Sequence, residues 1–213
     1  MKQNKIKAII FDVGGVLSLG KYQKHGVDGH HLMGIHHFMA DSFKIDIDTW
    51  FDAIDSVYAK SIEGKVSRKK ALSIMAVNLN TSVKKLKELF LKAYKKHFIK
   101  NKELYKIAYK LKRKGYRIGI LSDQWYLSKD ALIKKKDTHR FNPVLISCDI
   151  GLRKPNPKLY SLLIKRLKLK PDEILFIDNR EWNLKPARRL GIKTILFKDN
   201  KQVVRDMGKI LEI

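Results

Sequence analysis

Cysteine, acidic residues and long apolar runs are all scarce in this sequence of 213 residues, and each shortage excludes a class of protein. The single cysteine, Cys148, excludes an internal disulfide and a cysteine-based zinc cluster, and it fits a reducing compartment. No apolar run approaches the length that spans a membrane, and the N-terminus lacks the apolar core and cleavage site of a signal peptide. We therefore expect a cytoplasmic protein with no membrane partner.

The shortage of acidic residues leaves a formal net charge of +25, because 46 lysines and arginines face 21 aspartates and glutamates. Such an excess raises the question of nucleic acid or another polyanion as a partner. Most of the charge is lysine spread along predicted helices, whereas arginine, the better reader of bases and phosphates, is sparse. A nucleic-acid partner is therefore disfavoured, although the charge leaves it open. We expect a monomer or a dimer.

The first apolar stretch, from Ile6 to Val13, predicts a strand buried on both faces of a parallel sheet, because it is rich in branched residues. Asp12 lies at its C-terminal end, where open α/β sheets bind ligands. Gly14 and Gly15 follow at once and allow the backbone to turn tightly and approach a ligand.

Helical patterns fill the region after this strand, and we predict a helical cap over residues 20–100. Apolar residues at intervals of three and four predict helices over Ile47–Ile62, Ser67–Leu79 and Thr81–Phe98. A histidine group precedes them, and we expect it at the inner edge of the cap, facing the site: His25, His30, His31, His36 and His37. A metal site is disfavoured there, since no carboxylate or cysteine completes a ligand set.

Strands and helices alternate from residue 101 onward, which predicts βαβ units and a parallel sheet. The predicted strands are 116–121, 144–146, 173–177 and 193–197, and helices lie between them. Right-handed crossovers place every strand C-terminus at one rim of the sheet. The predicted fold class is α/β, with a Rossmann-like parallel sheet core (residues 1–19 and 101–213) and a helical cap inserted after the first strand.

Four motifs at these strand ends resemble the haloacid dehalogenase-like superfamily of hydrolases, in the subgroup that carries an α-helical cap. The first is the strand with FDVGGVL at residues 11–17, and the second is the strand that ends in Leu121-Ser122. Residues 153–160, RKPNPKLY, are similar to the lysine-bearing third motif. Residues 175–179, LFIDN, followed by Asn183, are similar to the fourth. The resemblance covers essentially the whole chain.

The resemblance implies the chemistry of phosphoryl transfer, in which a positioned nucleophile and charge neutralisation are both needed. Asp12 would attack phosphorus and form an aspartyl-phosphate, Ser122 would hydrogen-bond a phosphate oxygen, and Lys154 would screen the charge. Mg²⁺, which prefers hard oxygen ligands, would be held by residues at the strand ends. The implied metal ligands are Asp12, Gly14 and Asp178, and the candidate substrate contacts are His25, His30 and Asn179.

Two positions depart from the pattern of the family's phosphatases. Gly14 stands where they carry a second Asp that acts as general acid and base, so His25, Tyr22 or a cap histidine would have to supply that proton. Asn179 stands where many relatives have a second acidic residue, so Mg²⁺ affinity should fall. The missing second Asp also resembles the family's dehalogenases, which need no metal, but those enzymes lack an acidic residue at the position of Asp178.

These motifs favour a Mg²⁺-dependent phosphatase of a small phosphorylated metabolite. Two alternatives stay open at this point. One is a metal-independent hydrolase like the dehalogenases. The other is a non-catalytic protein of the same fold that binds a phosphorylated or polyanionic partner.

Overall fold

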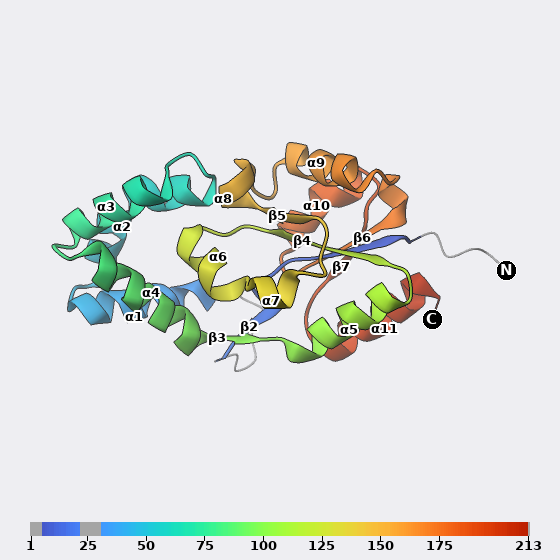
Figure 1. Ribbon diagram of the computed structural model, residues 1–213, viewed down its shortest axis with the longest axis horizontal. Coiled ribbons are helices and arrows are strands. Elements are labelled where there is room, and N and C mark those ends of the chain that lie inside the picture. Colours follow the sequence, from blue (N-terminus) through green and yellow to red (C-terminus); the bar gives the residue numbers. More distant parts are fainter. Residues whose placement is uncertain (1–5, 22–30, 213) are drawn as a thin grey trace.

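The computed structural model describes residues 6–21 and 31–212, with side chains described from residue 34 onward in the first helix. Its centre is a five-stranded sheet in the order β5-β4-β1-β6-β7, in which every pairing is parallel (Figure 1). The predicted α/β fold with a parallel sheet is confirmed. The strands are β1 (Ala8–Phe11), β4 (Arg117–Ser122), β5 (Val144–Ile146), β6 (Ile174–Asp178) and β7 (Lys193–Leu196).

The sheet is the middle of three layers. Successive residues of each buried strand point to opposite faces, so both faces are apolar and each is covered by helices. From β1, Ile9 and Phe11 pack with one face's helices, while Ala8 and Ile10 pack with the other's. The first face is covered by α5 (Lys102–Arg113) and α11 (Asn200–Leu211), and the second by α9 (Pro157–Leu167) and α10 (Glu181–Arg189) (Figure 1). Burial on both faces explains why these strands are short, continuous apolar runs.

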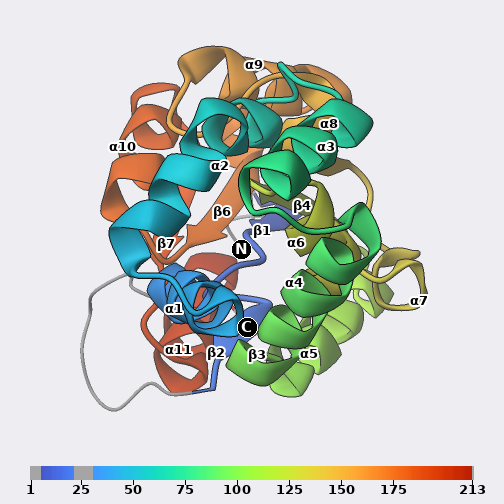
Figure 2. The same ribbon diagram turned by 90° about the vertical axis from the view of Figure 1, so that its left-hand side faces the viewer.

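Four helices that lie between β1 and β4 in the sequence form a separate helical part, which lies over the C-terminal ends of the strands (Figure 2). Side-chain oxygens of Asp46, Ser67 and Ser82 accept hydrogen bonds from the first turns of the second, third and fourth helix. Their apolar stripes form a hydrophobic cluster of their own, centred on Trp50 and Phe90. The helices are α1 (His31–Phe43), α2 (Ile47–Ile62), α3 (Arg68–Asn78) and α4 (Val83–His97).

Two short antiparallel strands, β2 (Ser18–Gly20) and β3 (Phe98–Lys100), carry the chain into and out of this helical part. The sequence predicted no strand at either position, and the difference has a physical reason. Pairing between residues about 80 apart in the chain leaves no local signal in segments of three residues. The structure thus has a two-stranded connection where the cap boundaries at residues 20 and 100 were predicted. The division into two domains stays a prediction.

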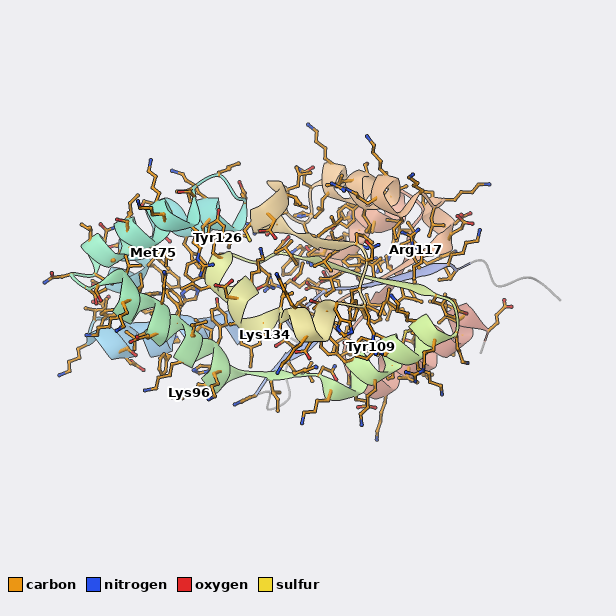
Figure 3. The ribbon with its side chains drawn as sticks, in the orientation of Figure 1. Met75, Lys96, Tyr109, Arg117, Tyr126 and Lys134 are labelled. Atoms are coloured by element: carbon orange, nitrogen blue, oxygen red, sulfur yellow. The ribbon has the colours of Figure 1, made fainter. Side chains whose placement is uncertain are left out.

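The helical part also rests on the sheet part through side chains that follow β4. Trp125 belongs to the hydrophobic cluster of the helices, lies 4.6 Å from Phe90 between ring centroids, and donates its indole N–H to Tyr94 Oη at 2.8 Å. Tyr126, labelled in Figure 3, donates its hydroxyl to the Val66 carbonyl at 2.7 Å. The remaining short helices are α6 (Tyr126–Leu132), α7 (Lys135–Thr138), α8 (Ser147–Ile150) and the 3₁₀ turn η1 (Pro171–Glu173).

Candidate active site

Three polar side chains meet at one rim of the sheet, because the strands that carry them are neighbours and run in the same direction. Asp12 follows directly after β1, the central strand, while Ser122 ends β4 on one side and Asp178 ends β6 on the other. All three side chains are buried or nearly so. Right-handed βαβ connections bring the carboxyl ends of parallel strands to one edge, which is where this fold class binds ligands.

Lys154 joins two of these groups from the loop between α8 and α9. Gly151 ends α8 in the left-handed conformation, at φ 73°, and turns the chain into this loop. The Lys154 ammonium lies 3.1 Å from Asp12 Oδ1 and 2.5 Å from Asp178 Oδ2, and the residue is only 3% exposed. A buried ammonium placed between two carboxylates can neutralise charge on a bound anion without water competing for it.

Asp178 accepts four hydrogen bonds from three nitrogen donors, two on each carboxylate oxygen. Oδ1 accepts from the Arg180 backbone at 2.8 Å and from Asn183 Nδ2 at 3.1 Å. Oδ2 accepts from Lys154 Nζ at 2.5 Å and from Asn183 Nδ2 at 3.1 Å. A metal ion on Asp178 would have to displace one of these donors, so the prediction that Asp178 ligates a metal stays a prediction.

The two glycines after Asp12 differ in the room around them. A Cβ on Gly15, whose φ is +81°, would lie 2.3 Å from Asn179 Nδ2, so only glycine fits beneath this side chain. A Cβ on Gly14 would have Gln124 Nε2 as its nearest neighbour, at 4.0 Å. Position 14 therefore has space for a side chain that the sequence does not provide.

Asn179 brings an unused acceptor to this place. Its Oδ1 is buried and, among the residues that the structure describes, has no hydrogen-bond partner. An orphaned buried oxygen costs free energy unless a ligand or ion completes it. Together with a carboxylate oxygen of Asp12 and the backbone of Gly14, it makes a hard-oxygen donor set that fits Mg²⁺ chemically. The set carries a single negative charge, and the described residues contain no group of three or more His, Cys, Asp or Glu side chains that would hold a metal.

Charge in the site is set by burial and by the lysine. Burial raises the pKa of Asp12 to about 6, and Lys154 opposes that rise less strongly. For Lys154, burial lowers the pKa, but the carboxylates of Asp12, Asp178 and Asp123 together raise it above its ordinary value. Lys154 is therefore an ammonium at any physiological pH, and Asp12 is largely ionised at neutrality.

Ser122 and Gln124 form a short hydrogen-bonded chain that ends on Asp12. The Gln124 side-chain amide donates to Ser122 Oγ at 3.0 Å, and the Ser122 hydroxyl hydrogen-bonds the Asp12 carboxylate. Ser147 Oγ fixes the Gln124 backbone, accepting from its N–H at 3.0 Å. The hydroxyl therefore points at the nucleophile position and lies where an oxygen of a bound anion could take its hydrogen bond.

A cleft of about 130 Å³ opens over these groups, between the sheet rim and the helices above it. The rim contributes Asp12, Gly14, Asp123, Lys154 and Asn179, while α2 and α4 contribute Tyr58, Ile62 and Tyr94. Trp125, Ser128 and Leu132 complete the side wall. The floor is thus charged and the ceiling aromatic, which suits a small molecule with an anionic end.

The histidine prediction is corrected where the structure describes it. His36 is buried in the helical cluster, accepts the Trp50 indole N–H on Nδ1 at 2.9 Å, and does not line the cleft. Its neighbours are aromatic, since its ring centroid lies 4.9 Å from that of Phe51. His25, His30 and Tyr22 lie outside the described residues. Among the residues that the structure describes, Tyr58, Ile62, Tyr94 and Phe98 overlook the site from the helical part and its connection.

Two site residues, Asp123 and Gln124, were not singled out from the sequence. Asn183 was named in the fourth motif, but its hydrogen bonds to both carboxylate oxygens of Asp178 were not predicted. Asp123 and Gln124 had a usable signal, because they directly follow Ser122 at a strand end. The contact of Asn183 with Asp178 joins the first turn of α10 to the end of β6, and it depends on how the chain turns between these two elements.

Comparison with known proteins agrees with this architecture. A family model described as haloacid dehalogenase-like hydrolase matches residues 6–191. Bifunctional epoxide hydrolase 2 of Mus musculus is 29% identical over 78% of this chain, but the match covers 29% of that protein, so the chain spans less than a third of its length. A glyceraldehyde 3-phosphate phosphatase of Pyrococcus furiosus is 30% identical over 48% of this chain and 43% of its own. An (S)-2-haloacid dehalogenase 4A of Burkholderia cepacia is 33% identical over 40% and 38%.

Solved structures resemble nearly the whole chain. A predicted HAD-like family hydrolase from Porphyromonas gingivalis superposes with a TM-score of 0.77, covering 98% of this chain and 99% of that one at 20% identity. A HAD family enzyme from Bacteroides thetaiotaomicron, solved with magnesium and inorganic phosphate, superposes with a TM-score of 0.68 at 20% identity, covering 93% and 98%. At this identity the likeness shows the fold.

Proposed function

From the premise that this chain belongs to the haloacid dehalogenase-like hydrolases, we propose that it hydrolyses a small phosphorylated metabolite through an aspartyl-phosphate on Asp12. One observation carries the proposal: the Lys154 ammonium is buried between the carboxylates of Asp12 and Asp178, at 3.1 Å and 2.5 Å. A nucleophilic carboxylate beside a fixed cation is what attack on an anionic phosphoryl group requires.

Each residue of the chain has a distinct part in this proposal. Asp12 attacks phosphorus while Lys154 and the Ser122 hydroxyl bind the phosphoryl oxygens. Asp178, Asn183 and the Arg180 N–H keep Lys154 in place through the Asp178 carboxylate. The buried setting excludes water, so these charges act at a low local dielectric.

Mg²⁺ would be held by oxygens of Asp12, Gly14 and Asn179. When bound, it would neutralise part of the negative charge on the phosphoryl group. Because Asn179 is neutral, we expect weak binding. The support for this metal is the orphaned Asn179 Oδ1 and the family likeness to an enzyme solved with magnesium.

The cleft limits the substrate. About 130 Å³ beneath Tyr58, Tyr94 and Trp125 admits a phosphoryl group and a leaving group of a few heavy atoms or one ring. The proposal therefore specifies small metabolites and excludes phospholipids and polynucleotides as substrates.

A second candidate is a metal-independent hydrolase acting on a carbon–halogen bond. Two observations favour it: position 14 lacks a carboxylate, and a metal on Asp178 would have to displace one of the three nitrogen donors that bind its carboxylate. Likeness to a haloacid dehalogenase over part of the chain agrees with it. In this reaction Asp12 would attack carbon and form an ester.

A substrate screen separates the two. Small aryl and alkyl phosphates and 2-haloacids are offered to the protein with Mg²⁺ and with a chelator, and phosphate, phenolate and halide release are measured. We expect Mg²⁺-stimulated phosphate release that disappears in Asp12→Asn, with Asp48→Asn, an exposed helix position, as the matched control. Halide release without metal would replace the proposal by the second candidate, and neither product would remove both.

A further inference from the structure

None of the residues assigned so far donates a proton to the leaving group. Position 14 is glycine, and a Cβ there would have Gln124 Nε2 as its nearest neighbour, at 4.0 Å. A leaving alkoxide needs a proton, and one positioned acid is worth about 10²–10⁴-fold in rate. His36, one of the residues expected to supply it, is buried away from the cleft.

Asp123 is a carboxyl group that lines the same cleft and has no part in the mechanism so far. It follows Ser122 at the end of β4, the strand beside β1. Phe11 pairs with Ile120, so Gly14 and Asp123 both follow the ends of neighbouring strands, and both line the cleft. Neighbouring strands lie about 4.8 Å apart. A carboxyl on residue 123 can therefore reach into the region that a residue 14 carboxyl would occupy.

The hydrogen bonds of Asp123 hold it in place and leave one oxygen over. Oδ1 accepts the Lys154 backbone N–H at 3.0 Å, which ties Asp123 to the loop whose side chain contacts Asp12. Among the described residues, no hydrogen bond uses Oδ2. Oδ2 is also not among the fully buried atoms that lack a partner, so it is accessible to solvent. Because Asp123 lines the cleft, we infer that this oxygen faces the open volume of the cleft.

The charges around Asp123 come from three directions. Lys154 and Arg153 on the loop before α9 favour its ionised form, and Asp178 at the end of β6 disfavours it. Burial is the largest influence and raises the pKa of Asp123 above its ordinary value. Its neutral form is thus more populated near neutrality than that of an exposed aspartate, as a proton donor requires.

We propose that Asp123 is the general acid and base of this site, in place of the carboxyl absent from position 14. The inference rests on the proposed phosphatase function and goes beyond it by assigning the proton. Asp123 is a catalytic residue in this proposal, because its Oδ2 would contact the leaving oxygen.

The proposed reaction has two steps. In the first, the Asp12 carboxylate attacks phosphorus and the bond between phosphorus and the leaving oxygen breaks. The leaving oxygen takes the proton of neutral Asp123, and the alcohol departs. Asp123, now a carboxylate, then takes a proton from water as the water oxygen attacks the aspartyl-phosphate. The bond between phosphorus and Asp12 breaks, inorganic phosphate departs, and Asp12 carboxylate and neutral Asp123 are regenerated.

Asp123→Asn tests the inference, because its amide oxygen keeps the acceptor for Lys154 N–H while the exchangeable acid is lost. On an alkyl phosphate we expect kcat/KM to fall by about 10²-fold, the lower range for one acid–base group. On an aryl phosphate, whose phenolate leaves without a proton, the first turnover stays within a few fold, and a burst of one phenolate per protein precedes a slow steady state. The wild type shows no burst, because its Asp123 also speeds the hydrolysis step.

The pH profile adds a readout that a structural role would not move. In the wild type, kcat/KM for the alkyl phosphate falls with rising pH as neutral Asp123 is lost, and this limb is absent in Asp123→Asn. Gly14→Asp added to Asp123→Asn should restore part of the alkyl activity, since a Cβ at position 14 fits without a close contact and position 14 lines the cleft.

Equal losses on alkyl and aryl substrates without a burst would overturn the inference, since they would reduce Asp123 to a support for the Lys154 loop. In that case Asp12-dependent aryl turnover by the wild type would still stand for the proposed function. Absence of any Asp12-dependent phosphate release by the wild type would overturn both.

Discussion

Asn183 clamps Asp178: one side-chain amide nitrogen lies 3.1 Å from each of the two carboxylate oxygens. Asn183 stands in the first turns of α10, and its own backbone carbonyl accepts the Tyr160 hydroxyl at 2.6 Å. The clamp therefore connects a helix on one face of the sheet to the charge that fixes Lys154. Its removal should disturb Asp178 and, through it, the position of Lys154.

Asn183→Leu keeps the size of the side chain and removes its donor. We expect a loss of about 1–3 kcal/mol in the free energy of unfolding, because a buried carboxylate loses a hydrogen-bond donor. Urea denaturation measures it, with turnover followed in parallel. Glu181→Gln on the same helix is the control, since its partner Arg188 is exposed and such pairs contribute about 1 kcal/mol or less. Equal losses in the two variants would show that Asp178 does not depend on the clamp.

Gly15→Ala should destabilise the protein more than Gly115→Ala. Both glycines have positive φ, +81° and +93°, so both alanines carry the same backbone penalty of about 1–2 kcal/mol. A Cβ on Gly15 would also lie 2.3 Å from Asn179 Nδ2, whereas one on Gly115 meets nothing within 4 Å. The difference between the two unfolding free energies isolates the contact with Asn179. No difference would mean that Asn179 moves aside freely.

The sequence predicted the position of those site residues that lie at the end of a predicted strand. Asp12, Ser122 and Asp178 are the last polar residues of apolar runs, so the rim that they share follows from parallel topology alone. The strand that was predicted from Glu173 begins at Ile174, because Glu173 belongs to the 3₁₀ turn before it. Such one-residue shifts are ordinary at element ends.

Other features depend on contacts between distant segments and left no local pattern. The ceiling of the cleft comes from Tyr58 and Tyr94, whose helical spacing indicates only an apolar stripe. Trp125 was not assigned to any element, yet it is part of the helical cluster. His36 was expected at the cleft as a member of the histidine group at the start of the cap, but its ring accepts the Trp50 indole N–H in the cap interior.

Asn179→Asp should tighten Mg²⁺ binding. The orphaned Oδ1 of Asn179 would become part of a carboxylate, and a hard divalent cation gains most from added negative charge. Isothermal titration calorimetry with Mg²⁺ measures the dissociation constant of both proteins. Asn80→Asp, an exposed position in the helical part, adds the same charge far from the site and should leave the constant unchanged. If the two variants behave alike, residue 179 does not contact the metal.

His36 should make stability fall at acidic pH. Burial, followed by the positive charge of His37, lowers the pKa of His36 from 6.5 to about 4. Between pH 6.5 and about 4, His36 is therefore protonated in the unfolded chain and neutral in the folded protein. The contribution is complete above pH 6.5 and is lost as pH falls toward about 4, by up to about 3 kcal/mol.

His36→Gln tests this assignment, because its side-chain oxygen can accept the Trp50 indole N–H while the titrating group is removed. Urea unfolding is measured above and below the window between pH 6.5 and about 4. We expect the wild type to lose more stability across the window than the variant, since the carboxylates titrate alike in both. His139→Gln, an exposed histidine beside Arg140, is the control and should follow the wild type. Parallel curves for His36→Gln and the wild type would show that the folded protein accommodates a charged His36, and that its burial under Trp50 does not set the acid limit.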